Sequence, residues 1–360
     1  MPGPDITHPQ SKSKGAIYFF LLTIIAVIAA LAFPLFALQG GKQAQSPPVG
    51  PGPNANVQAQ SPAAPSPPSS QNNQQNGAFV IRKDVDEVRL TATVIDDRQR
   101  IVTDLTRNDF SVFEDGKPQT IISFHHEDIP VSMGIVIDNS GSMREKRAKV
   151  NQAALNLVRS SNPQDEVFVV NFNDEYYLDQ DFTNDLLKLK DALEKIDARG
   201  GTALYEAIVA SADHLAKDGR LDHKVLFVVT DGEDNASRET LEQAVKQLQE
   251  ENGPSVYAIG ILGDEEHPKR AKRALEIIAQ RTGGLAFFPK TLDEVDEISK
   301  QVAHDIRSQY TIGYKPTTPK SAGGFRTIRV DAKAKGHGKL MVRTKTGYYA
   351  GPQPVAEGSK

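Results

Sequence analysis

The sequence contains no cysteine and no tryptophan among its 360 residues. Without cysteine, the chain forms no disulfide and offers no thiol nucleophile, no cysteine-ligated zinc site and no iron–sulfur cluster. A strong excess of one charge sign is also missing, since 42 Lys and Arg residues stand against 46 Asp and Glu residues for a net charge of −4. Nucleic-acid-binding proteins usually have an excess of basic residues, which this chain lacks. We therefore expect no nucleic-acid partner.

The rest of the composition is that of a globular protein. Hydrophobic residues make up 39% of the chain, or about 46.5% with the 27 glycines (27/360) added, and charged residues make up 24%. These shares are ordinary for folded domains. A wholly disordered or fibrous chain is therefore excluded. The length of 360 residues exceeds the usual size of one domain, so we expect two folded units.

A long uncharged run lies near the N-terminus. Residues 16–38 read AIYFFLLTIIAVIAALAFPLFAL, and no charge occurs between Lys14 and Lys42. About 20 apolar residues span a bilayer as a helix, so the run predicts a transmembrane signal-anchor. The alternative is a cleaved signal peptide, whose apolar core is usually only about 7–15 residues long. Lys12 and Lys14 favour a cytoplasmic tail of residues 1–15. The protein would then be single-pass in the inner (cytoplasmic) membrane, with periplasmic or extracellular domains.

Residues 39–78 have the composition of a spacer. They contain eight Pro, eight Gln and five Asn residues, one charge and no aromatic residue. Such a segment has too few apolar side chains to form a core. We therefore expect a disordered linker that holds the following domains away from the lipid surface.

The middle of the chain alternates between short apolar runs and amphipathic segments. Residues 131–138 (VSMGIVID) and 224–230 (KVLFVVT) are typical of buried strands. Further strands are expected at 166–172, 175–182, 256–261 and 285–288, and helices at 143–161, 184–196, 202–217, 239–250, 271–281 and 292–306. The alternation predicts an α/β fold over residues 129–307, a doubly wound, mainly parallel, six-stranded Rossmann-like sheet with helices on both faces. Ligands bind such sheets at the carboxyl ends of the strands.

Oxygen-bearing side chains stand on the loops at that predicted edge: Asp138, Ser140, Ser142, Thr202 and Asp231. Carboxylate and hydroxyl oxygens suit magnesium, manganese or calcium rather than copper or zinc. Two carboxylates formally cancel the charge of a divalent cation, and the hydroxyls add coordination without further negative charge. Each residue alone is also typical of a loop or a helix cap, as Ser142 and Thr202 are at helix starts. Together they predict a metal site.

The order of these five residues resembles the metal-ion-dependent adhesion site of the von Willebrand factor A domain, also called the integrin I-type domain. That site is written Asp-x-Ser-x-Ser, then a distant Thr and a distant Asp, and all five positions match over about residues 130–306. The resemblance implies that Asp138, Ser140 and Ser142 lie nearest a Mg²⁺ ion, or else Mn²⁺ or Ca²⁺. It also implies that Thr202 and Asp231 bind the ion directly or through water.

The flanks of this domain show the alternating pattern of half-buried strands. Strands are expected at 88–94, 110–112, 121–124, 310–314 and 325–332, with a return strand at 340–344. Each flank has too few strands for a stable unit, so we expect 79–128 and 308–350 to form one small β-sandwich around the inserted domain, with a flexible tail at 351–360. The segments LTRNDFSVFEDGKPQTIISF and FRTIRVDAKAKGHGKLMVRTKTGYYA resemble the flanks of the acidobacterial-type VWFA-related protein family.

Three further patterns receive plainer interpretations. Residues 125–128 (HHED) lack the spacing of a zinc-protease helix and are interpreted as a polar connector. The basic run 267–273 is interpreted as a solvated helix face. Glu233 and Asp234 lie close to the motif but outside it, and they are interpreted as a solvated acidic rim.

The sequence supports three functions. The first is a non-enzymatic, membrane-anchored module that captures an acidic group of a protein partner through a divalent cation. The second is a structural part of an envelope complex, in which the metal only braces loops. The third is a metal-dependent hydrolase. The sequence places no histidine or spare carboxylate as a general base for it, although Glu233 could be reached. The identity of the partner, the choice of metal and the oligomeric state stay open.

Overall fold

The computed structural model describes residues 87–126, 128–195, 198–263 and 267–351. The predicted tail (1–15), transmembrane helix (16–38) and linker (39–78) lie outside the described residues, as do residues 352–360 of the predicted C-terminal tail. Within the described part of the chain, no helix is both long and apolar enough to cross a membrane.

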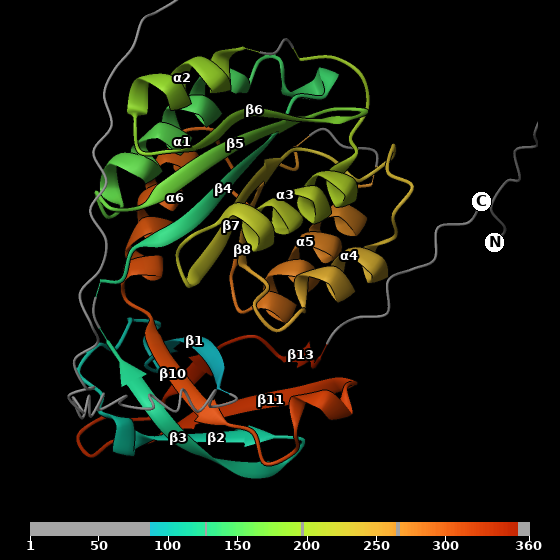
Figure 1. The fold of residues 1–360 in the computed structure, drawn as a ribbon. Coiled ribbons are helices and arrows are strands. Elements are labelled where there is room, and N and C mark those ends of the chain that lie inside the picture. The colour runs from blue at the N-terminus through green and yellow to red at the C-terminus, as the bar shows by residue number, and fades with distance from the viewer. Residues whose placement is uncertain (1–86, 127, 196–197, 264–266, 352–360) are drawn as a thin grey trace, which may run out of the picture. The chain divides into compact units, whose positions relative to one another are not determined.

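An α/β lobe, residues 131–307, contains a mixed six-stranded sheet in the order β6-β5-β4-β7-β8-β9 (Figure 1). The strands are β4 (Val131–Asp138), β5 (Glu166–Phe172), β6 (Tyr176–Thr183), β7 (His223–Thr230), β8 (Ser255–Gly260) and β9 (Ala286–Phe287). All neighbouring pairs are parallel except β5 and β6, which are antiparallel. The six-stranded, mainly parallel sheet expected from the sequence is therefore present.

Helices cover both faces of this sheet (Figure 1). One face carries α1 (Arg147–Ser160), α2 (Leu186–Glu194) and α6 (Glu294–Arg307), and the other carries α3 (Leu204–Asp218), α4 (Leu241–Leu248) and α5 (Pro268–Thr282). Because side chains alternate along a strand, β4 sends Ile135 and Ile137 to the first face and Val136 to the second. Both faces are thus buried, which explains why these strands are continuous apolar runs.

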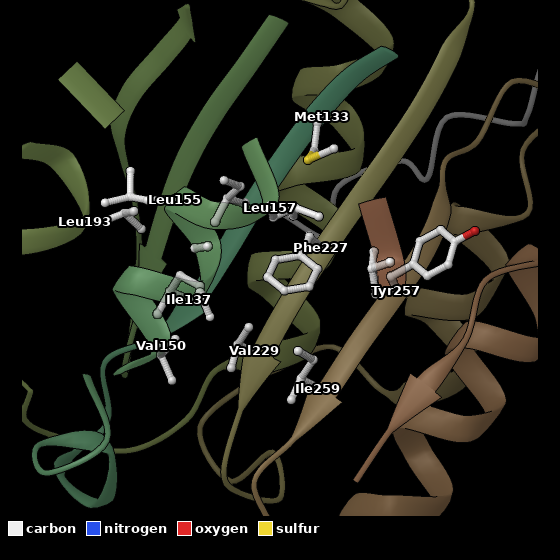
Figure 2. Packing of buried hydrophobic residues seen from close by; sticks show 14 of the residues in the cluster. Met133, Ile137, Val150, Leu155, Leu157, Leu193, Phe227, Val229, Tyr257 and Ile259 are labelled. Atoms are coloured by element: carbon white, nitrogen blue, oxygen red, sulfur yellow. The ribbon is translucent and has the colours of Figure 1, made fainter. Parts of the chain in front are cut away.

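The core on the α1 side is closely packed around the central strands. Figure 2 shows Ile137 of β4, Phe227 and Val229 of β7 and Ile259 of β8 beside residues of α1. Phe227 and Ile259 are fully buried. Full burial of a side chain of this size contributes about 1.5–3 kcal/mol. The carboxyl ends of the strands are therefore held on a rigid base.

A second sheet, the β lobe, is built from both flanks in the order β12-β1-β10-β3-β2-β11-β13. Its strands are β1 (Val88–Ile95), β2 (Phe110–Glu114), β3 (Lys117–His125), β10 (Tyr310–Lys315), β11 (Phe325–Ala332), β12 (Met341–Arg343) and β13 (Gly347–Tyr349). Strands from before and after the α/β lobe pair directly, with Leu90 opposite Ile312. The two flanks combine as expected, but the described strands form one seven-stranded sheet rather than the two packed sheets of the predicted sandwich.

Turn chemistry explains the hairpin between β2 and β3. Asp115 and Gly116 both have positive φ, at 49° and 76°, which is what a two-residue type I′ turn requires and what the Asp-Gly pair indicates.

The described residues of the segment 125–128 agree with their interpretation as a polar connector. The ring of His126 stacks on Tyr310, and Asp128 pairs with Arg307 at 2.6 Å, so these side chains do not converge on one point.

Several sequence-based expectations were wrong. The helix expected from residue 143 begins at Arg147, because a short 3₁₀ turn (Gly141–Met143) precedes it and buries Met143. The strand expected at 285–288 has only two residues, since β9 pairs with no more than Ala258 and Ile259. The return strand at 340–344 does not pair with β11. It is β12, which pairs with β1, whereas β13 takes the edge of β11.

Candidate metal centre

Two neighbouring parallel strands bring the candidate residues together. β4 ends at Asp138, and β7, which pairs with it in register, ends one residue before Asp231. The side chains of Asp138 and Asp231 are both 0% exposed. Parallel strands place their carboxyl ends at one edge of the sheet, so the two carboxylates enter the same small volume.

The serine hydroxyls join this pair of carboxylates. The Oγ atoms of Ser140 and Ser142 lie 3.1 Å apart, and Ser142 Oγ donates to Asp231 Oδ1 at 2.9 Å. Ser140 is buried and Ser142 is exposed, because the 3₁₀ turn lifts the second serine toward solvent. The Ser142 hydroxyl therefore connects the buried Asp231 carboxylate to the surface.

Asp138 is fully enclosed, as Asp231 is. Its Oδ1 accepts the Ser140 backbone N–H at 2.7 Å, and its Oδ2 accepts the Thr230 hydroxyl at 2.6 Å. Burial raises the pKa of the Asp138 carboxyl to about 6. The hydrogen bonds from Thr230 and Ser140 oppose this rise, and the charge of Asp231 adds to it. Two buried carboxylates repel each other, so the pair favours a cation between them.

Thr202 stands on a neighbouring loop that backbone hydrogen bonds tie to the serine loop. Gly141 N–H donates to Gly200 O at 3.2 Å, and Arg199 N–H donates to Asn139 O at 2.8 Å. Thr202 is buried, and its own backbone N–H donates to Asn235 Oδ1 at 2.8 Å. The structure therefore places all five sequence-predicted residues on adjoining loops at one edge of the sheet.

The donor set fits a hard divalent cation. It consists of two carboxylates and three hydroxyls, all oxygen ligands. The neighbouring Asn139 is fully buried, and neither polar atom of its amide has a hydrogen-bond partner among the described residues. Buried polar groups normally have partners, and a hydrated cation beside Asp138 would bring such partners into the loop.

Sequence reasoning missed three residues at this site. Lys146, at the start of α1, forms an ion pair with Asp231 Oδ2, and its side chain is 18% exposed. Asp174 Oδ1 accepts the Gly201 N–H at 2.8 Å and so shapes the Thr202 loop. Thr230 could have been identified from the sequence, since it is the last residue of a buried strand and directly precedes Asp231. No sequence pattern of this kind identifies Lys146 or Asp174.

The acidic residues after Asp231 have other roles. Glu233 pairs with Arg270 of the basic run at 3.1 Å. Asp234 accepts backbone N–H groups from Tyr205 and Ser237 at 2.9 and 3.1 Å. The sequence suggests a solvated rim, but the structure engages both residues in contacts. Within the described residues, no group of three or more His, Cys, Asp or Glu side chains converges as a metal site, so the candidate rests on two carboxylates and hydroxyls.

Residues 133–233 match the family model of the von Willebrand factor type A domain. The match starts within β4 and ends just beyond β7, so it spans all five candidate residues. An uncharacterized protein of Synechocystis sp. is 29% identical over 114 residues, which is 30% of this chain and 27% of that protein. This chain therefore covers only about a quarter of the length of that relative. The α/β lobe contains a domain of the von Willebrand factor type A kind.

Solved structures with partial similarity include three bacterial proteins. A von Willebrand factor type A protein from Catenulispora acidiphila has 15% identity and a TM-score of 0.44, over 68% of this chain and 74% of that chain. An aerotolerance-related membrane protein from Bacteroides fragilis has 20% identity and a TM-score of 0.40, over 49% and 98%. The von Willebrand factor domain of a type V pili tip protein from Porphyromonas gingivalis has 13% identity and a TM-score of 0.40, over 50% and 97%.

Proposed function

We propose that this protein is a membrane-anchored, metal-dependent protein-binding module that serves adhesion or complex assembly. The observation that supports it best is the joined set of Asp138, Ser140, Ser142 and Asp231 at the carboxyl edge of the sheet. The exposed Ser142 hydroxyl donates to buried Asp231 and contacts Ser140 Oγ, and buried Asp138 accepts the backbone N–H of Ser140. This arrangement suits a cation held on one side by the protein and open on the other to a partner.

Each residue has a distinct part in the proposed site. Asp138 and Asp231 supply the negative charge that offsets the dehydration of the cation, and the hydroxyls of Ser140, Ser142 and Thr202 supply neutral oxygens. A bound Mg²⁺, Mn²⁺ or Ca²⁺ would offer its open position to a carboxylate of the partner. Ser142 lies at the exposed end of the chain of oxygens, so the partner approaches from its side.

The geometry favours binding over the two alternatives. A hydrolase needs a free general base near the metal, but Glu233 is paired with Arg270. A metal that only stabilises the loops would be needed where the loops lack other interactions with each other. Here Gly141 N–H to Gly200 O and Ala203 N–H to Asn173 O, at 3.2 and 2.6 Å, already join the loops. A non-enzymatic partner-capture role is therefore the better proposal.

The membrane part of the proposal rests on the sequence of residues 16–38. That run would anchor the protein in the inner membrane as a single-pass protein, with the linker 39–78 presenting both lobes outside the cytoplasm. Protease accessibility in spheroplasts tests it. Digestion of the lobes is expected, and their protection would overturn the topology.

Calorimetry on the full chain in detergent tests the metal site. Asp138→Ala should weaken Mg²⁺ binding by more than about tenfold, because even residues that only orient metal ligands contribute that much. Ser140→Ala should weaken it less, because water can replace a neutral hydroxyl. The exposed Asp191 is the control, and Asp191→Ala should leave affinity unchanged. Equal affinity in wild type and Asp138→Ala would overturn the site.

A pull-down from membranes tests the use of the site. The partner should be retained with Mg²⁺ or Mn²⁺, released by a chelator, and lost in Asp138→Ala. Retention of the partner in the presence of chelator would contradict metal-dependent capture, while the calorimetric result would still stand.

A further inference from the structure

A second candidate site lies at the opposite, amino edge of the α/β sheet. A cavity of about 720 Å³ lies there between the two lobes. Its α/β wall includes Lys224 at the start of β7 and Ser255 at the start of β8, and its β-lobe wall includes Thr91 of β1 and Thr311 of β10. The sheet separates this cavity from the carboxyl edge, so it is distinct from the proposed metal centre.

The acidic groups that line the cavity are already paired. Arg89 forms ion pairs with Glu87 and Asp222, and Lys320 pairs with Glu251. A further lining cation, Arg220, is held by Glu166 at 2.9 Å. These contacts account for all three lining carboxylates and for three of the five lining Lys and Arg side chains.

Two lysines remain with no carboxylate of the described residues within ion-pair distance. Lys345 is 9% exposed, and its ammonium donates to the backbone oxygen of Glu251 at 2.8 Å. Burial lowers the pKa of Lys345 to about 8, an effect that the charge of Glu251 partly opposes. Lys224 is half-buried, burial also lowers its pKa, and no ion pair to it is found in the described part of the chain. The charge of Glu251 only partly offsets the lost hydration of the Lys345 ammonium. The charges of Asp222 and Glu166 likewise only partly offset it for Lys224. Both lysines would therefore gain from an anion.

Neutral hydrogen-bonding groups from both lobes line the same cavity. The hydroxyls of Thr91 and Ser255 lie 3.3 Å apart, and His223 Nε2 lies 2.8 Å from Thr311 Oγ1. Burial lowers the pKa of His223, so its ring adds a neutral polar group. A ligand in this cavity would meet two cations and several hydroxyls.

We propose that the cavity between the lobes binds a small dianion, of the phosphate or dicarboxylate class, through Lys224 and Lys345. Ser255 and Thr91 hydroxyls would donate to the remaining oxygens. Because Lys224 belongs to the α/β lobe and Lys345 to the segment between β12 and β13, the ligand bridges the two lobes and stabilises their contact. The concentration of this dianion would then determine how rigidly the two lobes are held together.

Titration calorimetry on the full chain tests this, with inorganic phosphate and succinate as probes at constant ionic strength. We expect saturable binding of at least one probe, and a rise in the unfolding temperature with its concentration. Lys224→Gln and Lys345→Gln should each weaken binding by about tenfold or more, the effect of losing one charge-assisted hydrogen bond. Lys345→Gln removes the charge and keeps an N–H donor on a side chain one bond shorter than lysine, so the unfolding temperature of each variant without anion shows whether its fold persists.

The exposed Lys188 of α2 supplies the matched control, and Lys188→Gln should bind as the wild type does. The two probes separate the phosphate class from the dicarboxylate class. Failure of both probes to bind saturably would overturn the proposal. Equal affinity in the wild type, Lys224→Gln and Lys345→Gln would overturn it as well, because the anion would then be held elsewhere.

Discussion

At the scale of the residue, Lys146 is the most informative side chain of the candidate metal centre. Its ammonium contacts Asp231 Oδ2, while Ser142 Oγ occupies Asp231 Oδ1 at 2.9 Å. Both oxygens of Asp231 therefore have partners within the chain. A divalent cation that binds Asp231 directly competes with this ammonium, whereas one that binds through water leaves it in place.

We expect Lys146→Met to raise Mg²⁺ affinity about two- to fivefold, since a partly exposed ion pair of this kind is modest in strength. Methionine keeps the length and apolar stem of lysine but removes the charge. Calorimetry measures the change. Lys149→Met, which removes a nearby lysine that pairs with Asp293, is the control and should have no effect. Unchanged affinity in Lys146→Met, with Asp138→Ala still impaired, would mean that Asp231 binds through water.

At the scale of the elements, a buried charge network joins strands from both flanks. Glu114 of β2 accepts from Tyr314 of β10 and from Tyr348 of β13, at 2.5 and 2.9 Å. Arg326 of β11 lies 3.2 Å from the same carboxylate, and both side chains are nearly fully buried. The network therefore connects a strand before the α/β lobe to three strands after it.

Glu114→Gln should destabilise the protein by about 3–5 kcal/mol, because it leaves the buried Arg326 charge without its counter-charge. Urea unfolding measures the loss. Adding Arg326→Met to this variant removes the orphaned charge and should recover part of the stability. Arg326→Met alone is the reference. If Arg326→Met lowers the stability of the Glu114→Gln variant by as much as it lowers that of the wild type, the two residues are not coupled.

The contact between the lobes should respond to pH through His223. Burial lowers the pKa of this histidine in the folded state, so its contribution to stability is present above the unfolded value of about 6.5 and is lost as pH falls below it. Stability should therefore drop as the pH falls below about 6.5 in the wild type. His223→Gln, which can still hydrogen-bond Thr311, should reduce that drop, and the exposed His304→Gln should not. Identical pH profiles for wild type and His223→Gln would contradict this assignment.

At the scale of the whole molecule, the two lobes differ in their dependence on the ends of the chain. The α/β lobe has its own sheet and both helical layers between residues 131 and 307. The β lobe uses strands from both flanks, and β1 lies between β12 and β10, which both come from the C-terminal flank.

Deleting residues 308–360 should therefore expose both edges of β1 and cause aggregation, while the α/β lobe keeps its structure. Limited proteolysis should digest the N-terminal flank first and leave a fragment near 131–307. The matched control lacks only residues 352–360 and should behave as the full chain. If the larger deletion left stability and solubility unchanged, the two flanks would not depend on each other as the paired strands indicate.

Local signals account for what the sequence predicted. Continuous apolar runs identified the central strands, and the Asp115-Gly116 pair identified a hairpin, because each depends on neighbouring residues alone. The five candidate ligands follow strand ends or precede a helix, so topology placed them at one edge. The ion pair of Lys146 with Asp231, 85 residues apart, and the cavity lined by Lys224 and Lys345 depend on tertiary approach. No period or motif marks them.

The wrong prediction of the partner strand at 340–344 has the same cause, because strand pairing also depends on tertiary contacts. A turn at 336–338 followed by an alternating run favours a hairpin with 325–332, yet β12 pairs with β1, more than 200 residues earlier in the chain. The choice between two partner strands is decided by the shape of the assembled sheet. A local pattern carries no information about it.

The insertion of one lobe within the other has a consequence for the order of events during synthesis. His125 pairs with Thr311, so β3 and β10 are partners although the whole α/β lobe separates them along the chain. At about 5–20 residues per second, the intervening stretch takes roughly 10–40 s to emerge from the ribosome. During that interval β1 and the β2–β3 hairpin have no C-terminal partners. The α/β lobe, whose strands pair within itself, can fold first and bring its two ends together, and the newly made β10 then arrives beside β3.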